Sequence, residues 1–149
     1  MKQTIALYLC LLLLGSCAGE ASHKSEQDTA SAATTYTPPP PGSVVAEDSV
    51  LIKESLNASK LTVRILSDEY SHMGSYKLNI KYGPDSDTSN FTLPKGAGKL
   101  EPILKKGAGY GYQIGFNYEG RYHEYCELTF KPGPPHEARF RQVKNYILK

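Results

Sequence analysis

The sequence contains no tryptophan, three cysteines and no strong excess of charge of either sign in its 149 residues. Three cysteines cannot build the disulfide framework on which many small secreted domains depend. The 17 lysines and arginines face 15 aspartates and glutamates, and this near balance gives no field that would draw a nucleic acid to the chain. We therefore expect no nucleic-acid partner and a fold that depends on its hydrophobic core.

Motifs for metal binding and catalysis are also scarce. Asp85 and Asp87 alternate as calcium ligands do, but their loop lacks the glycine and the terminal glutamate of an EF-hand, so we expect a polar turn. His123, Glu124 and Cys126 stand close in sequence. On a regular strand, however, His123 points away from the other two. We expect no enzyme, no metal site and no cofactor.

The chain has no apolar run long enough to cross a membrane as a helix, which takes about 20 residues. Its first apolar run, residues 4–14, follows the basic Lys2 and stops at the small pair Gly15-Ser16, directly before Cys17. This layout is typical of a secretory signal peptide. We therefore exclude the run from the folded domain.

The boundary Leu14-Gly15-Ser16-Cys17 resembles the lipobox of bacterial lipoproteins. The resemblance implies that residues 1–16 are a lipoprotein signal peptide and that the thiol of Cys17 takes a diacylglycerol. Because each buried CH₂ contributes about 0.8 kcal/mol, two or more acyl chains would anchor the protein durably in a bilayer. The implied location is the cell envelope, and Ala18 favours the outer membrane because the family places Asp there for inner-membrane retention. The side that the domain faces stays open.

An ordinary signal peptide is the alternative. Ser16-Cys17-Ala18 loosely fits the small-x-small pattern of signal cleavage, and a cut after Ala18 would release a soluble protein. In either case Cys10 leaves with the signal. A lipidated Cys17 would leave Cys126 with no partner in its own chain, so we expect Cys126 to be buried and inert, with an intermolecular disulfide as the alternative.

Residues 17–46 are rich in small and polar residues and include four consecutive prolines, Pro38 to Pro41. Such a segment lacks the apolar surface that would offset its ordering entropy, and the prolines favour a short polyproline II rod. We expect a disordered, proline-rich tether over 17–46. The domain should follow at 47–149.

Period-2 alternation of apolar and polar residues dominates the rest of the chain. The clearest example is residues 75–82 (SYKLNIKY), and residues 61–66 and 110–118 follow the same pattern. Glu119-Gly120 separates two such runs and predicts a hairpin between residues 110–118 and 121–131. In the second run we expect Tyr122, Glu124 and Cys126 to share one face.

These runs predict an all-β fold, namely a small antiparallel β-sandwich of immunoglobulin-like type. A small open barrel is the alternative. The segment 139–146 fits a closing strand, although Phe140, Val143 and Ile147 also stand at helical spacing.

Tyrosines crowd the segment 110–125, and a ring with a polar tip suits a binding surface. Tyr110, Tyr118 and Tyr125 are the candidate ligand contacts, with Tyr125 the best candidate for an exposed ring. The alternative is that these rings fill a core that has no tryptophan.

The function expected from these observations is a membrane-anchored envelope lipoprotein whose β domain binds a partner, such as another envelope protein, without catalysis. A carbohydrate-binding surface module is the alternative. A secreted soluble protein, or a hydrolase or inhibitor with a site not visible in the sequence, is the third hypothesis.

Overall fold

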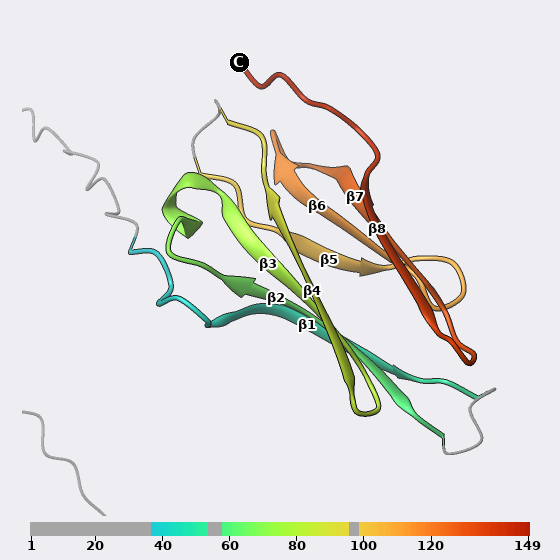
Figure 1. The fold of residues 1–149 in the computed structure, drawn as a ribbon. Coiled ribbons are helices and arrows are strands. Elements are labelled where there is room, and N and C mark those ends of the chain that lie inside the picture. The colour runs from blue at the N-terminus through green and yellow to red at the C-terminus, as the bar shows by residue number, and fades with distance from the viewer. Residues whose placement is uncertain (1–36, 54–57, 96–98) are drawn as a thin grey trace, which may run out of the picture. The chain divides into compact units, whose positions relative to one another are not determined.

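The computed structural model describes residues 37–53, 58–95 and 99–149 (Figure 1). Cys17, the signal peptide and most of the expected tether lie outside the described residues. A short 3₁₀ helix, η1 (Ser71–Met73), is the one helical element among them. The strands are β1 Val44–Leu51, β2 Lys60–Ser67, β3 Ser75–Tyr82, β4 Asp85–Thr92, β5 Ile103–Lys106, β6 Tyr112–Tyr118, β7 Arg121–Lys131 and β8 Glu137–Gln142.

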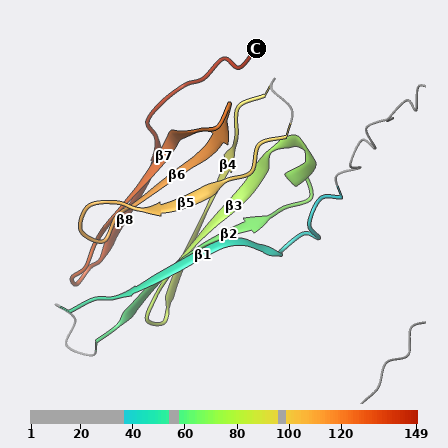
Figure 2. The ribbon, with the colours of Figure 1, turned by 180° about the vertical axis from the view of Figure 1, so that it is seen from behind.

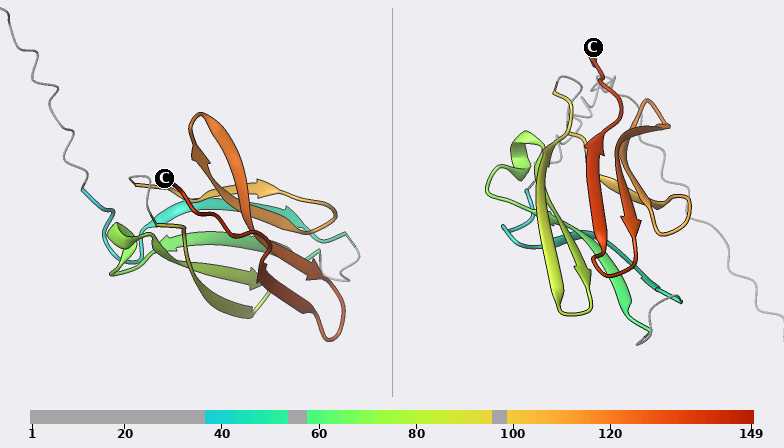
Figure 3. Two further views of the ribbon diagram at one scale, coloured as in Figure 1. Left: turned by 90° about the horizontal axis from the view of Figure 1, so that it is seen from above. Right: turned by 45° about the vertical axis from the view of Figure 1, so that its right-hand side comes forward.

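The strands form two antiparallel four-stranded sheets. Sheet A has the order β1-β2-β3-β4 and sheet B the order β5-β6-β7-β8, and Figure 3 shows them as two layers. The predicted all-β antiparallel sandwich is confirmed. Each sheet is a simple meander, whereas an immunoglobulin domain distributes consecutive strands between its two sheets.

Both sheets bury their inner faces in one hydrophobic core. Sheet A contributes the alternate residues of β2 and β3 that the sequence pattern predicts, and sheet B contributes those of β6 and β7. The largest side chains with less than 2% exposure include Tyr76, Tyr112, Phe116, Leu61, Ile65, Leu78, Ile114 and Leu128.

The outer strands of the two sheets approach each other at both sides of the sandwich. On one side β4 runs beside β8 (Figure 3), where the rings of Phe91 and Phe140 are 5.8 Å apart. On the other side β5 lies against β1 (Figure 2). These contacts cover apolar side chains at sheet edges, where water would otherwise reach the core.

Two strand boundaries differ from the expectation. Strand β1 begins at Val44, three residues before the expected domain start at residue 47. Asp85 and Asp87 were expected in a polar turn, and this is wrong because both lie on β4. The turn is only Gly83-Pro84, in which Gly83 has a φ of 56°. A two-residue turn of this kind lets the strand resume at once.

The hairpin predicted around Glu119-Gly120 is confirmed. Strands β6 and β7 pair up to Tyr118 and Arg121. The two intervening residues have φ values of 50° and 72°. A type I′ turn requires positive φ at both positions, and its twist matches that of the flanking strands.

A β-bulge in β7 overturns the face predicted for its first half. Ile114 pairs with Cys126, but the next residue of β6, Gly115, pairs with Glu124. Tyr125 is therefore an extra residue, and the alternation of β7 shifts by one at this point. The expected grouping of Tyr122 and Glu124 with Cys126 is wrong, because His123 and Tyr125 take the inner face instead.

The strand predicted over residues 139–146 is confirmed for residues 139–142, which lie on β8, but residues 143–146 are not part of a strand. Residues 143–149, hereafter the C-terminal segment, leave the sheet beside the β6–β7 hairpin (Figure 1). The backbone of Tyr125 holds the start of this segment, since its carbonyl accepts hydrogen bonds from the amides of Val143 and Lys144. The Tyr146 hydroxyl donates to the carbonyl of Glu124 at 2.8 Å.

Candidate functional site

The three tyrosines expected to contact a ligand do not form one exposed row. Tyr125 is only 8% exposed, so the prediction of an exposed ring at this position is wrong. The bulge turns its ring inward, against Phe116. Tyr110 and Tyr118 stand at opposite ends of β6 and are half-buried. The Tyr110 hydroxyl accepts a hydrogen bond from the amide of Lys53, and the Tyr118 hydroxyl donates to the carbonyl of Lys149.

His123 lies in an aromatic cluster. Its ring stacks on Phe116 with centroids 5.6 Å apart, and Tyr146 meets it edge-on at 5.3 Å. Tyr118 lies on a further side at 6.1 Å. The bulge puts His123 on the same face as Cys126, contrary to the expected alternation. The contacts of His123 are therefore those of a packed ring at the rim of the core.

Cys126 is 2% exposed, as expected for a buried thiol. Burial raises its pKa to about 11. A thiol that keeps its proton at neutral pH is a poor nucleophile, because the thiolate is the reactive species. This environment suits a small apolar packing residue.

Ser67 fixes the point at which the chain enters the domain. Its hydroxyl donates to the carbonyl of Pro40 and accepts from the amide of Ser43, and its backbone amide donates to the carbonyl of Ser43 at 2.9 Å. The amide of Gly42 donates to the carbonyl of Ser67 at 2.8 Å. We call this set of bonds the Ser67 clamp. It places the last residues of the tether at the end of sheet A that carries η1.

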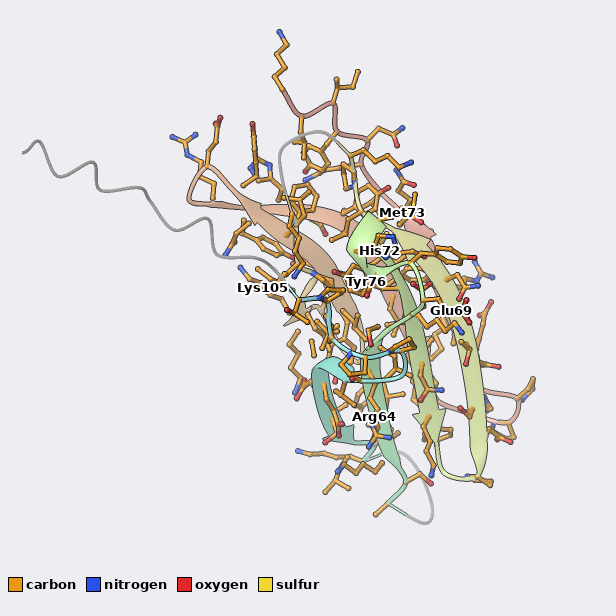
Figure 4. All side chains as sticks on the ribbon, turned by 90° about the vertical axis from the view of Figure 1, so that its left-hand side faces the viewer. Arg64, Glu69, His72, Met73, Tyr76 and Lys105 are labelled. Carbon is orange, nitrogen blue, oxygen red and sulfur yellow. The ribbon has the colours of Figure 1, made fainter. Side chains whose placement is uncertain are left out.

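A surface pocket of about 260 Å³ opens at the same end of sheet A. We call it the η1 pocket. Leu93 and Leu100, which are 2% and 6% exposed, form its floor. His72 and Met73, which lie side by side on η1 (Figure 4), both line the pocket. Its lining is His72, Met73, Gly74, Leu93, Pro94, Lys95, Lys99 and Leu100.

The loop around η1 is held by hydrogen bonds that explain the shape of the rim. The Asp68 carboxylate accepts from the amide of Tyr70 and from the hydroxyl of Ser75, both at 2.8 Å. Gly74 ends η1 with a φ of 83°, a conformation that a residue with a side chain rarely adopts. Its carbonyl accepts from the amide of Leu93 at 2.9 Å, which ties the loop to the pocket floor.

The exposed apolar residues beside this pocket suit protein docking. Met73 is 50% exposed and Tyr70 is 57% exposed. Aromatic residues and methionine are enriched in the centres of protein interfaces, and methionine adapts to different partners. The pocket is smaller than the range of about 300–1,000 Å³ typical of small-molecule sites. Its size and apolar floor fit one or two side chains of a partner protein.

Sequence reasoning did not find the η1 pocket. The signal available was the stretch DEYSHMG between two clear strands, where a tyrosine and a methionine stand in a connection that is otherwise polar. No pattern indicated that Leu93 and Leu100, which come from another connection, would lie beneath them.

No family model, curated protein or solved structure matches the chain. In the part of the chain that the structure describes, there is no helix with the length and hydropathy needed to span a membrane.

Proposed function

We propose that the chain is a membrane-anchored envelope lipoprotein whose β-sandwich binds a partner protein without catalysing a reaction. Acyl chains on Cys17 hold it to the bilayer, with the outer membrane as the favoured location. The observation that carries the anchor is the sequence Leu14-Gly15-Ser16-Cys17 at the end of a short apolar segment. A tether then leads to a folded domain.

The η1 pocket supports the binding role. It combines a buried apolar floor with the exposed Met73 at its rim, and the exposed Tyr70 directly precedes η1. Lys99 forms an ion pair with Glu101 at 2.6 Å, which gives the surroundings of the pocket a polar character. An apolar centre with a polar rim is the usual composition of a protein interface.

The anchor is tested by acyl labelling of the full-length chain in a lipidating bacterial host. Cys17→Ser should lose the incorporated palmitate analogue and leave the membrane fraction, because only a thiol forms the thioether. Cys126→Ser is the matched control and should keep both properties. Label retained by Cys17→Ser would contradict the proposal.

The binding role is tested by a photoreactive residue at position 73 in intact cells, with position 147 as the control because Ile147 is 94% exposed. A cross-linked product of one defined mass is expected from position 73 and absent from position 147. Products from both positions, or from neither, would contradict docking at the η1 pocket.

A further inference from the structure

The outer face of sheet A carries cations without matching anions. Residues directly opposite each other on neighbouring strands share a face, and the register puts Arg64 opposite Asn79 and Lys81 opposite Thr62. On this face of the four strands one carboxylate, Glu47, accompanies four cationic side chains. These are Lys60, Arg64, Lys77 and Lys81.

The acidic residues of β4 take the other face. Asp85 is opposite Tyr82 and Asp87 is opposite Ile80, so both share the side of the core residues. The residues of β4 that lie next to the lysines of β3 are Ser86, Thr88 and Asn90. The acidic residues of this edge strand thus lie on the opposite side of sheet A from the lysines of β3, although the whole chain is close to neutral.

Three of the four cations have no ion-pair partner within the described residues. Arg64 donates to Glu47 at 2.7 Å, and this guanidinium, with a smaller contribution from the charge of Lys60, holds the pKa of the Glu47 carboxyl below its ordinary value. Lys60, Lys77 and Lys81 are exposed. Like charges left on one face are a cost in the free protein, and an anion placed among them would remove it.

The cations surround a shallow hollow of about 250 Å³. Its lining is Lys60, Thr62, Arg64, Lys81 and Gly83. Figure 4 shows Arg64 on β2, well away from His72 and Met73 at the η1 pocket. The absence of a side chain at Gly83 and the small Thr62 leave room between the cations, so an anionic group can approach them together.

Hydrogen-bonding side chains continue from the hollow across β3 and β4. The Asn79 amide donates to the hydroxyl of Ser86 at 2.9 Å, and Thr88 lies beside it. Along β3, Lys77 and Lys81 are separated by about 14 Å, because each strand residue advances about 3.4 Å. The face therefore offers charges at intervals with neutral donors and acceptors between them.

The composition of this outer face distinguishes between three kinds of anionic partner, namely a protein, a lipid surface and a polysaccharide. A protein interface places aromatic and apolar residues at its centre and is depleted of lysine. This face of the four strands carries no aromatic ring, and its exposed apolar side chains, Val44 and Leu51, stand at the two ends of the edge strand β1 and not at the centre of the face. Attachment to a lipid surface needs charge and inserted apolar groups, and the hydroxyl and amide side chains would have no role in it. A hydrated polymer with spaced carboxylates and many hydroxyls fits both the spaced cations and the neutral hydrogen-bonding side chains between them.

We infer that the outer face of sheet A binds an acidic polysaccharide, with the carboxylate of a uronic acid in the hollow between Lys60, Arg64 and Lys81. This inference rests on the proposed function only in that the domain is a binding module. It uses a different surface from the η1 pocket and does not depend on the lipid anchor.

The test measures binding of the full-length protein, kept in a non-ionic detergent, to immobilised alginate, a polymer of uronic acids, with dextran as the neutral control. In about 0.1 M salt, where exposed charges are partly screened, the double variant Lys60→Gln/Lys81→Gln should bind alginate at least tenfold more weakly. The matched control is Lys106→Gln/Arg121→Gln on sheet B. It removes the same charge from exposed residues and should change binding less than twofold.

Equal weakening in the two double variants would overturn the inference, since it would show that only net charge matters. Equal binding to dextran would also overturn it, as would tighter binding to polyglutamate or to vesicles of phosphatidylcholine and phosphatidylglycerol. The Cys17→Ser chain should bind alginate as the unmodified chain does. Failure of the anchor and failure of this inference are thus read from separate measurements.

Discussion

The ring of Tyr122 covers Gly115 on the outer face of sheet B. A β-carbon at Gly115 would approach within 2.7 Å of this ring and would overlap the carbonyl oxygen of His123. The ring also receives the ammonium group of Lys105, 3.6 Å from the ring centroid. Side chains from β5 and β7 therefore meet over a bare backbone in β6.

Gly115→Ala should lower the free energy of unfolding by about 1–3 kcal/mol, because the added methyl group forces the two strands apart. The conflict with a backbone oxygen cannot be relieved by a rotamer change. Asn117→Ala, at an exposed position on the same strand, should change stability by less than about 0.5 kcal/mol. Denaturant unfolding of both variants checks the difference, and equal effects would contradict it.

Tyr122→Phe should leave stability unchanged or raise it by up to about 1 kcal/mol. The Tyr122 hydroxyl is buried and has no hydrogen-bond partner among the described residues, so its removal relieves an unsatisfied polar group. Tyr146→Phe is the opposite case, since it loses the hydrogen bond to Glu124 and should cost about 0.5–1.5 kcal/mol. Denaturant unfolding checks the prediction: the midpoint of Tyr122→Phe should lie above that of Tyr146→Phe, and the reverse order would contradict it.

Tyr146→Ala should release the C-terminal segment and cost about 1–3 kcal/mol. The Tyr146 ring packs against Phe116 and His123, with centroids 5.4 and 5.3 Å away. Faster hydrogen exchange is expected at the amides of Val143 and Lys144. Ile147→Ala is the control, because a side chain that is 94% exposed contributes little packing. Equal exchange in the two variants would show that the segment is held by its backbone alone.

Stability should fall as the pH rises from about 9 to about 11. Burial raises the pKa of Cys126 to about 11, whereas the unfolded chain releases this proton at lower pH. The unfolded state then binds fewer protons, so the free energy of unfolding decreases through this window, by roughly 2–3 kcal/mol for a shift of about two units.

Urea unfolding at pH 8 to 11 checks this prediction in a chain whose Cys10 and Cys17 are replaced by serine. Cys126→Ala in the same background should show a shallower decline. Tyrosines whose pKa burial also raises, Tyr122 to about 12 and Tyr112 further, leave a residual decline in both above pH 10. Parallel curves would contradict the role of the thiol.

The sequence predicted those parts of the fold that depend on neighbouring residues. Residues 75–82 alternate over one strand, and Glu119-Gly120 supplies the positive φ values of a tight hairpin turn. Both features follow from local pattern and turn chemistry. The sequence also predicted a strand over residues 139–146, where the helical spacing of Phe140 and Val143 competed, and residues 139–142 of it lie on β8.

The features of the fold and of the candidate sites that the sequence did not predict depended on contacts between strands. The bulge at Tyr125 arises where β7 meets Gly115, and a period-2 pattern continued through it predicts the wrong face. The first half of strand β4 is poor in β-branched and aromatic residues, so its propensity pointed to a turn around Asp85 and Asp87, while pairing with β3 makes it a strand. The hollow between Lys60 and Lys81 likewise exists only because of the cross-strand register.

The Ser67 clamp gives the domain a mechanical property. Tension that arrives through the N-terminal residues reaches the hydrogen bonds between Ser67 and Pro40, Gly42 and Ser43 before it reaches the pairing of β1 with β2. Those bonds lie outside the sheet ladder, so they can break and re-form while the core stays intact. Under tension the hydrogen bonds of the clamp would therefore break first, and the pairing of β1 with β2 at the edge of sheet A would stay intact.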